Sequence, residues 1–159
     1  MILCLVGTNP YDFTRLVKAI DTMAPKINIP IVIQIGNTEY KPKNCEFFSF
    51  KAKDEVGELI SQSELVISQG GYGSMTDAIM LNKKLIGVPR KIEFKESQDN
   101  QVELVEYYES KGYLKACYEI EKLESLVLDT LNNKFVFKKY IRETNVTVGS
   151  IIKDFLNEI

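Results

Sequence analysis

The chain has 159 residues, a formal net charge of −2 and acidic and basic residues interspersed along its length. This length suits one well-cored domain, and the charge pattern excludes the basic surface that nucleic-acid-binding proteins require. The longest apolar runs have five or six residues, well short of a membrane-spanning helix, so we expect a cytoplasmic protein without a nucleic-acid partner.

Hydrophobic periodicity predicts strands and helices in alternation along the chain. Short runs rich in β-branched residues indicate buried strands, and apolar residues three or four positions apart indicate helices. The predicted strands are Ile2–Val6, Ile31–Ile35, Phe47–Phe50, Leu65–Ser68, Lys84–Val88 and Tyr113–Ala116. The predicted helices are one that follows a cap at Asp12, then Asp54–Gln62, Ser74–Leu81, Asn100–Ser110, Glu121–Leu131 and Val146–Ile159.

The predicted strands are apolar throughout, which is typical of a parallel sheet covered on both faces. We therefore predict a Rossmann-like α/β domain, with an open parallel sheet of about six strands and helices on both faces. Residues 1–159 contain no internal repeat or linker, so the prediction is a single domain.

The stretch Leu65–Arg90 joins a strand, a glycine-rich turn, a helix and a further strand. Gly70, Gly71 and Gly73 predict a turn that uses the positive φ and the close backbone approach that glycine tolerates. Free N–H groups at the start of the following helix would make this turn an anion site. A P-loop would need a lysine after Gly73, and a dinucleotide fingerprint would need glycine where Thr76 stands, so both motifs fit poorly.

The sequence has no histidine and no Asp-x-Asp pair, and its three cysteines are widely spaced. Histidine is the usual general base and the commonest metal ligand, and carboxylates are the usual ligands of divalent ions at phosphates. Cysteines at this spacing fit neither a disulfide framework nor a zinc site. We therefore expect no metal, no cofactor and no general base of the usual kind.

Five segments carry further sequence patterns. Val6–Asn9 resembles V-G-T-H, and Ile33–Asn37 resembles I-Q-I-G-H. Leu65–Asp77 resembles A-D-x-V-I-S-H-G-G-x-G-S-x-x-E, Leu85–Arg90 resembles P-x-I-x-V-P-R, and Asp99–Glu103 resembles D-H-Q-x-E. In this order the patterns resemble the donor-binding half of GT-B glycosyltransferases of the MurG type. The resemblance is greater to stand-alone subunits of two-part enzymes: the PssE/CpsF-type polysaccharide proteins and the donor subunit of the dolichol-linked GlcNAc transferase.

The resemblance implies one half of a GT-B fold that binds a UDP-sugar. It implies that the glycine turn holds the diphosphate, that Asp77 holds the ribose hydroxyls and that the backbone around Val88–Arg90 receives the uracil. Gln101 would bind the sugar hydroxyls, and Arg90 could reach a phosphate. The donor-binding residues implied in this way are Thr8, Gly70, Gly71, Gly73, Ser74, Asp77, Arg90, Asn100 and Gln101.

Ordinary structural roles compete with several of these assignments. Ser74 could be a helix N-cap, and Ser74-x-x-Asp77 could be a capping box. Asn100 could cap the helix that it precedes. Arg90 and Gln101 could simply be solvated. The sequence leaves both readings open at these positions.

Amides replace the histidines of the family pattern at Asn9, Asn37, Gln69 and Asn100. Asparagine and glutamine keep hydrogen-bonding capacity but cannot titrate. Asn9 follows the first strand beside Thr8, where the two residues either face the ligand crevice or form a simple turn. Asn9 is therefore only a weak catalytic candidate, because contacts that position a substrate survive this exchange and proton transfer does not.

The resemblance as a whole implies the donor-binding subunit of a two-part, metal-independent, inverting glycosyltransferase that acts on a lipid-linked acceptor in polysaccharide or glycolipid synthesis. The implied partner is a membrane-anchored, PssD-like subunit that binds the acceptor and holds this chain at the inner face of the membrane. The amphipathic Val146–Ile159 segment would either pack on its own domain or dock on that partner. Alone, the chain could associate with itself. The alternatives are an accessory subunit that activates its partner without catalysis and, ranked lower, a nucleotide-sensing module.

Overall fold

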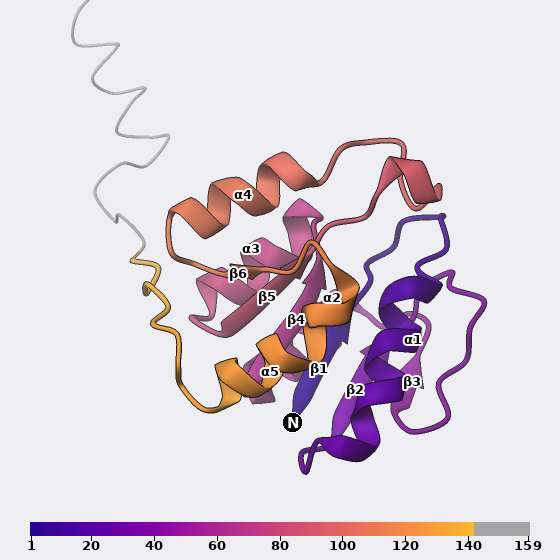
Figure 1. Ribbon diagram of the computed structural model, residues 1–159, viewed down its shortest axis with the longest axis horizontal. Coiled ribbons are helices and arrows are strands. Elements are labelled where there is room, and N and C mark those ends of the chain that lie inside the picture. The colour runs from indigo at the N-terminus through magenta and orange to yellow at the C-terminus, as the bar shows by residue number, and fades with distance from the viewer. Residues whose placement is uncertain (142–159) are drawn as a thin grey trace, which may run out of the picture.

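The computed structural model describes residues 1–141, which form a six-stranded sheet flanked by helices (Figure 1). The strand order is β3-β2-β1-β4-β5-β6, and each neighbouring pair is parallel. The strands are β1 (Ile2–Leu5), β2 (Ile31–Gln34), β3 (Glu46–Phe48), β4 (Leu65–Gln69), β5 (Lys84–Val88) and β6 (Lys115–Ala116). This order is that of a Rossmann fold, so the predicted fold class is confirmed.

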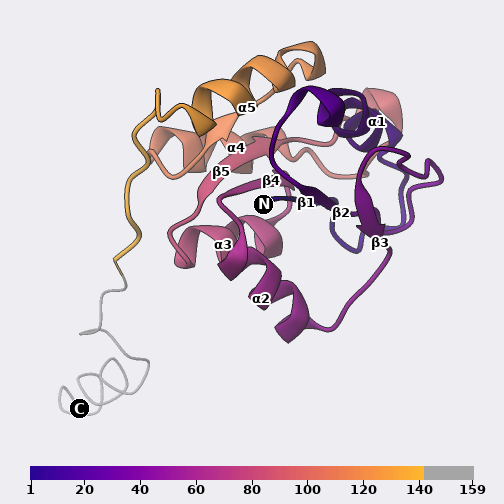
Figure 2. The ribbon, with the colours of Figure 1, turned by 90° about the horizontal axis from the view of Figure 1, so that it is seen from below.

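The helices lie on both faces of this sheet, as Figure 2 shows most clearly for α1 and α5 on one side and α2 and α3 on the other. The α-helices are α1 (Thr14–Met23), α2 (Lys53–Gln62), α3 (Tyr72–Met80), α4 (Val102–Ser110) and α5 (Leu123–Leu131). Short 3₁₀ helices are η1 (Ala24–Lys26), η2 (Ile92–Phe94) and η3 (Ile120–Lys122). The predicted Val146–Ile159 helix lies outside the described residues.

Two apolar cores, one on each face, explain why the strands are apolar throughout. Ile2 and Cys4 of β1 point into the core beneath α1 and α5, and Leu3 and Leu5 point into the core beneath α2, α3 and α4. All four side chains are fully buried. Since successive residues of a strand face opposite sides, a sheet covered on both faces needs apolar residues at every position.

A buried carboxylate ties α1 to the loop that precedes β3. Asp21 of α1 is 2% exposed and accepts hydrogen bonds from the Tyr40 hydroxyl (2.7 Å), the Lys43 N–H (2.9 Å) and the Asn44 N–H (2.6 Å). Burial alone would raise the pKa of Asp21, but these hydrogen bonds outweigh it and the pKa is lowered.

Several element boundaries differ from the sequence prediction. The helix after the glycine turn begins at Tyr72 and not at Ser74. The first helix has Phe13 as its N-cap, although Asp12 still accepts a hydrogen bond from the N–H of Thr14 at 2.8 Å. The side chain of Asn100 likewise bonds the backbone of a later residue, so α4 begins at Val102. In each case the boundary moves by one or two residues, which propensity alone does not resolve.

Candidate functional site

A large cleft lies at the carboxyl edge of the sheet, between the loops that follow β1 and β4. The strand order reverses between β1 and β4, and open α/β sheets bind their ligands at such a point. The cleft has a volume of about 840 Å³. Its lining residues are Gly7, Thr8, Asn9, Pro10, Gln34, Lys51, Lys53, Val56, Gln69, Gly71, Tyr72, Gly73, Ser74, Thr76, Asp77 and Gln101.

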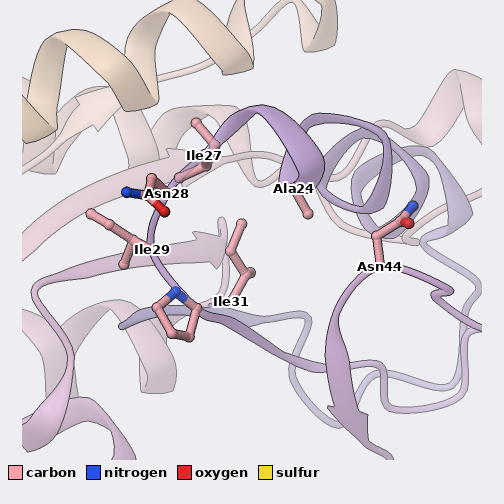
Figure 3. Close-up of a pocket in the computed structure, with 7 residues that line it drawn as sticks. Ala24, Ile27, Asn28, Ile29, Ile31 and Asn44 are labelled. Atoms are coloured by element: carbon pink, nitrogen blue, oxygen red, sulfur yellow. The ribbon is translucent and has the colours of Figure 1, made fainter.

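A second, smaller depression lies at the opposite, amino edge of the sheet (Figure 3). It has a volume of about 310 Å³, and the described residues that line it are apolar or carry amides, with no charged side chain among them. Its lining residues are Ala24, Ile27, Asn28, Ile29, Pro30, Ile31 and Asn44. A charged ligand would find no counter-charge there, so the larger cleft is the candidate site.

The glycines of the turn serve the close backbone approach that the sequence predicts, but they do not adopt the positive φ that it also predicts. Among the described glycines, φ is positive at Gly7, Gly36 and Gly112 only. A Cβ atom at Gly70 would lie 2.8 Å from Cβ of Gln101, so glycine at this position lets α4 pack closely. At Gly73 a Cβ atom would meet nothing within 4 Å, because this residue faces the open cleft.

The N-terminus of α3 opens onto the cleft without a side-chain cap. Gly71 is the N-cap residue, with φ −83° and ψ 143°, and the first turn contains no acidic residue. The first N–H groups of a helix have no partner within the helix, so those of Tyr72, Gly73 and Ser74 are available to a ligand. Ser74 lies within this first turn, so its predicted alternatives as an N-cap and as the start of a capping box are wrong.

Asp77 lies one turn further along α3 and also lines the cleft. It is partly exposed, and no salt bridge or side-chain hydrogen bond holds its carboxylate within residues 1–141. A carboxylate accepts two or more hydrogen bonds, as a ribose diol would require. Its assignment to the ribose stays a prediction.

Arg90 corrects both readings that the sequence left open. The residue is 1% exposed, so it is not solvated. Nη1 donates to the carbonyl oxygens of Tyr11, Asp12 and Glu96, each at 3.0 Å. Nη2 donates to the Val6 carbonyl, also at 3.0 Å. The guanidinium is therefore committed to protein acceptors and is not placed to bind a phosphate.

The surroundings of Arg90 show why this buried cation is tolerated. Its guanidinium carbon lies 4.4 Å from the centre of the Phe13 ring, and Nε donates to Gln69. Burial lowers the pKa of Arg90 to about 10, with Glu96 and Asp12 opposing this shift, so the group remains charged at neutral pH. Arg90 thus joins the loops that follow β1 and β5 to the end of β4.

Glu96 completes this buried polar cluster. It is 5% exposed and forms a two-pronged ion pair with Arg15, at 2.8 and 2.9 Å. The same carboxylate accepts the N–H of Lys91 at 2.9 Å. Sequence reasoning missed both Arg15 and Glu96, because they are far apart in the chain and belong to no recognisable motif.

Asn100 and Gln101 occupy different places. Asn100 is exposed and its Oδ1 accepts the N–H of Val102 at 3.0 Å in a local turn, but the N-cap residue of α4 is Gln101, so the capping alternative is wrong. Gln101 lines the cleft, and its Oε1 accepts the N–H of Arg90 at 3.1 Å. The N–H of Arg90, which is part of the Val88–Arg90 backbone that the resemblance assigns to uracil, is therefore already bound. The Gln101 amide group keeps its own N–H donors for a ligand.

Thr8 and Asn9 line the cleft from the loop after β1. The Asn9 Oδ1 accepts the N–H of Tyr11 at 2.9 Å, so this residue forms a local turn as well as facing the cleft. Thr8 is exposed. The structure brings both residues opposite the glycine turn and leaves their contact with a donor as a prediction.

Two lysines in the cleft were missed at the sequence level. Lys51 and Lys53 belong to the β3–α2 connection and the start of α2. Lys51 also pairs with the exposed Glu55 at 3.3 Å. No motif marks these residues, but together they place positive charge on the wall of the cleft.

Residues 1–141 contain no group of three or more metal-ligating side chains of the His, Cys, Asp or Glu type. Burial raises the pKa of Cys45 and of Cys117 to about 11, and raises that of Cys4 further. The cysteines are therefore neutral thiols at pH 7 and not activated nucleophiles. No helix in the same part of the chain has the length and apolar character needed to cross a bilayer.

A 3-2-1-4-5-6 parallel sheet with an uncapped helix N-terminus at its switch point is typical of nucleotide-binding α/β domains. The family model named Glycosyltransferase family 28 C-terminal domain matches residues 1–158. The chain therefore belongs to this family, as the sequence resemblance indicated.

Two curated relatives agree with this membership. The first is the UDP-N-acetylglucosamine transferase subunit ALG13 of Candida albicans, 30% identical over 95 residues that cover 60% of this chain and 31% of that protein. The second is the UDP-N-acetylglucosamine–N-acetylmuramyl-(pentapeptide) pyrophosphoryl-undecaprenol N-acetylglucosamine transferase of Clostridium tetani, 29% identical over 126 residues that cover 77% of this chain and 35% of that protein. The chain thus spans about a third of the length of these relatives.

Solved structures show the same fold. MurG of Acinetobacter baumannii has a TM-score of 0.58 and 16% identity, over 82% of this chain and 41% of that one. The solution structure of ALG13 has a TM-score of 0.56 and 18% identity, over 98% of this chain and 93% of that one. At such identities the likeness shows the fold alone.

Proposed function

We propose that this chain binds the nucleotide-sugar donor, a UDP-sugar, in a glycosyltransferase made of two chains. The observation that carries the proposal is the uncapped start of α3, which opens onto the cleft. A diphosphate there would accept hydrogen bonds from the free N–H groups and would interact favourably with the helix dipole. Both curated relatives are named as UDP-N-acetylglucosamine or N-acetylglucosamine transferases, which supports a uridine nucleotide.

The cleft offers charge stabilisation suited to inverting sugar transfer. In that reaction an acceptor hydroxyl attacks the anomeric carbon while the bond from that carbon to UDP breaks. Negative charge then develops on the departing diphosphate, where preorganised N–H donors stabilise it. Lys51 and Lys53 would add positive charge from the opposite wall. We propose that these groups stabilise the leaving group without a metal ion.

The acceptor side is assigned to a partner. Asp77 is the one carboxylate among the described residues that line the cleft, and we assign it to the ribose. Asn9, at the position where the family pattern has histidine, is an amide and cannot accept the proton of an attacking hydroxyl. A membrane-anchored, PssD-like subunit would supply the general base and a lipid-linked acceptor, and would hold this chain at the cytoplasmic face of the membrane. The name of ALG13, a transferase subunit, supports this division.

Binding of UDP is the first test. UDP at one hundred times its dissociation constant should stabilise the folded chain by about 2.7 kcal/mol, seen as a rise in melting temperature that persists in EDTA. Asp77→Asn should weaken UDP binding about tenfold or more, because a charge-assisted hydrogen bond to the ribose is lost. Asp54→Asn, an exposed change on α2, is the matched control. A chain that responds to no uridine nucleotide contradicts the proposal.

Sugar transfer is the second part of the test. The purified chain alone should release UDP from a UDP-sugar no faster than buffer does when lipid acceptor is present. Addition of the membrane partner should give turnover. An accessory subunit would instead leave the partner able to use the donor alone, at a lower rate, and UDP would not bind here. Transfer by the isolated chain at an ordinary enzymatic rate would contradict the two-chain arrangement.

A further inference from the structure

The side-chain amide of Gln69 has an orientation that the structure fixes. Gln69 ends β4, is 8% exposed and lines the floor of the cleft. Its Oε1 accepts a hydrogen bond from Nε of Arg90 at 2.6 Å. Because a guanidinium carries donors only, the oxygen of the amide must face Arg90. The –NH₂ group must then point away from Arg90.

The Nε2 atom of Gln69 lies against two backbone positions of the cleft. A Cβ atom placed on Gly7 would overlap Nε2, and one placed on Gly71 would lie 2.9 Å from it. Both glycines line the cleft, one in the loop after β1 and the other at the start of α3. Nε2 therefore sits where the two loops of the switch point meet.

This –NH₂ group has no acceptor among residues 1–141. The Oε1 atom of the same amide accepts a hydrogen bond from Arg90, but Nε2 donates a hydrogen bond to no described residue. Every fully buried side-chain nitrogen or oxygen in this part of the chain does have a partner. Nε2 is therefore exposed on the cleft side, beside the free N–H groups of α3. Its two N–H donors and those of the helix start point to the same place.

We infer that Gln69 binds the phosphates of the donor through Nε2, and that Arg90 is a positioning residue that holds the amide in this orientation. The inference rests on the proposed function. Arg90 does not touch the ligand itself, because its own donors are used by carbonyl oxygens. Its effect is to turn an amide, which could present either end, into a fixed donor. A neutral donor then lies on the floor of the anion site.

The Gln69→Glu variant separates this role from a purely structural one. A carboxylate keeps the acceptor that Arg90 needs and makes that contact an ion pair, so folding should be unaffected or improved. On the cleft side, however, the –NH₂ donor is replaced by a negatively charged oxygen, which would repel a phosphate. If Gln69 only serves Arg90, the variant should bind UDP as well as the wild type does.

The test compares UDP and uridine, which share the base and ribose and differ in the phosphates. In Gln69→Glu, UDP affinity should fall at least tenfold while uridine affinity stays within about twofold. Gln69→Met, which adds no charge, should show the same split with a smaller loss. Gln62→Glu places the same charge on an exposed position at the end of α2 and should leave both affinities unchanged. Folding of each variant is checked by circular dichroism and melting temperature.

The outcomes distinguish this inference from the proposed function. If wild-type protein binds UDP and folded Gln69→Met binds it equally well, the role of Gln69 is overturned and the donor site stands. An equal loss for uridine and UDP would also overturn it, since the contact would then not be with phosphate. If the wild type binds no uridine nucleotide, the proposed function fails and this inference fails with it.

Arg90 is tested through the signal of the Gln69 amide. In ¹⁵N nuclear magnetic resonance spectra, UDP should shift the Gln69 side-chain amide resonances of the wild type more than those of other glutamines. Arg90→Lys retains a positive charge but lacks Nε, so the amide should lose its fixed orientation and the UDP-induced shift should shrink. UDP affinity should fall severalfold with uridine affinity retained. An unchanged UDP-induced shift in a folded Arg90→Lys protein would overturn the positioning role of Arg90. If Arg90→Lys does not fold, the comparison of UDP with uridine in Gln69→Glu still tests the phosphate contact.

Discussion

Two polar regions lie side by side at the carboxyl edge of the sheet, and they differ in whether their hydrogen-bonding groups are used. Around Arg90 the donors meet backbone carbonyl oxygens of the loops after β1 and β5 and the side-chain amide of Gln69, and Glu96 is paired with Arg15. At the start of α3 the N–H groups, and Asp77 beyond them, have no side-chain partner within the described residues. A satisfied buried cluster holds a structure together, whereas unused donors around a cleft are available to a ligand. The same edge thus contains the support and the site.

Removal of the buried cation should give the largest effect. Arg90→Met leaves several buried carbonyl oxygens and Gln69 without a donor, so we expect a loss of about 3–5 kcal/mol in the free energy of unfolding. Lys26 is the comparison: its side chain is 60% exposed and forms an ion pair with Glu124. Lys26→Met breaks this pair and should lower the free energy of unfolding by about 0–1 kcal/mol. Denaturant unfolding measures both. Equal losses would mean that the Arg90 cluster is not the support we describe.

A satisfied carboxylate should affect stability in a pH-dependent way. Asp21→Asn removes an acceptor of three hydrogen bonds, and we expect a loss of about 1–3 kcal/mol at pH 7. Because the pKa of Asp21 is lowered in the folded state, its contribution is complete above the unfolded pKa of about 4 and is lost as pH falls through the folded value. The difference between wild type and variant should therefore shrink below about pH 4. A difference that stays constant down to pH 2 would contradict this account.

The smallest effect on stability should come from substitution of Gly73, where a side chain should stabilise the fold but weaken UDP binding. Gly73 lies in a helical first turn with open space where a side chain would stand, so Gly73→Ala should stabilise the fold by about 0.5 kcal/mol. Gly73→Val carries a larger side chain into the cleft and should weaken UDP binding, which a melting-temperature titration measures. Gly57→Ala, also helical and with nothing within 4 Å of the added Cβ, is the control outside the cleft. If Gly73→Val binds UDP as well as the wild type does, the phosphates do not bind at this turn.

Much of the fold could be predicted from the sequence, because apolar strands and helical periodicity are local signals. β1, β2, β4 and β5 fall within or beside their predicted ranges, and the parallel arrangement follows from strands that are apolar throughout. The glycine turn lies where the sequence predicts it, between β4 and α3, but its backbone conformation differs in part. The glycine pattern predicts both positive φ and close backbone approach: the first is wrong at Gly70, Gly71 and Gly73, and the second is confirmed at Gly70 by the approach of Gln101.

The rest of the site depends on contacts that no local pattern contains. The sequence places Arg90 just after a strand, where it could be solvated, but its burial depends on carbonyls of the distant β1–α1 loop. Lys51 and Lys53 precede a helix in a connection without a motif, and only the folded chain brings them to the cleft. The resemblance singles out the glycine turn, but tertiary structure decides which of the neighbouring hydrogen-bonding groups remain unused.

The central place of β1 bears on how this domain is made. β1 is the first strand of the chain, yet it lies between β2 and β4, and Ile2 pairs with Leu65. During synthesis Leu3 and Leu5 therefore lack one of their two neighbouring strands until β4 has been added. Such distant pairing is slow because loop entropy is lost before contacts form. The crevice between β1 and β4 comes into existence only with this late step. A nucleotide that needs both of its walls would then lengthen the lifetime of the folded chain without hastening its folding.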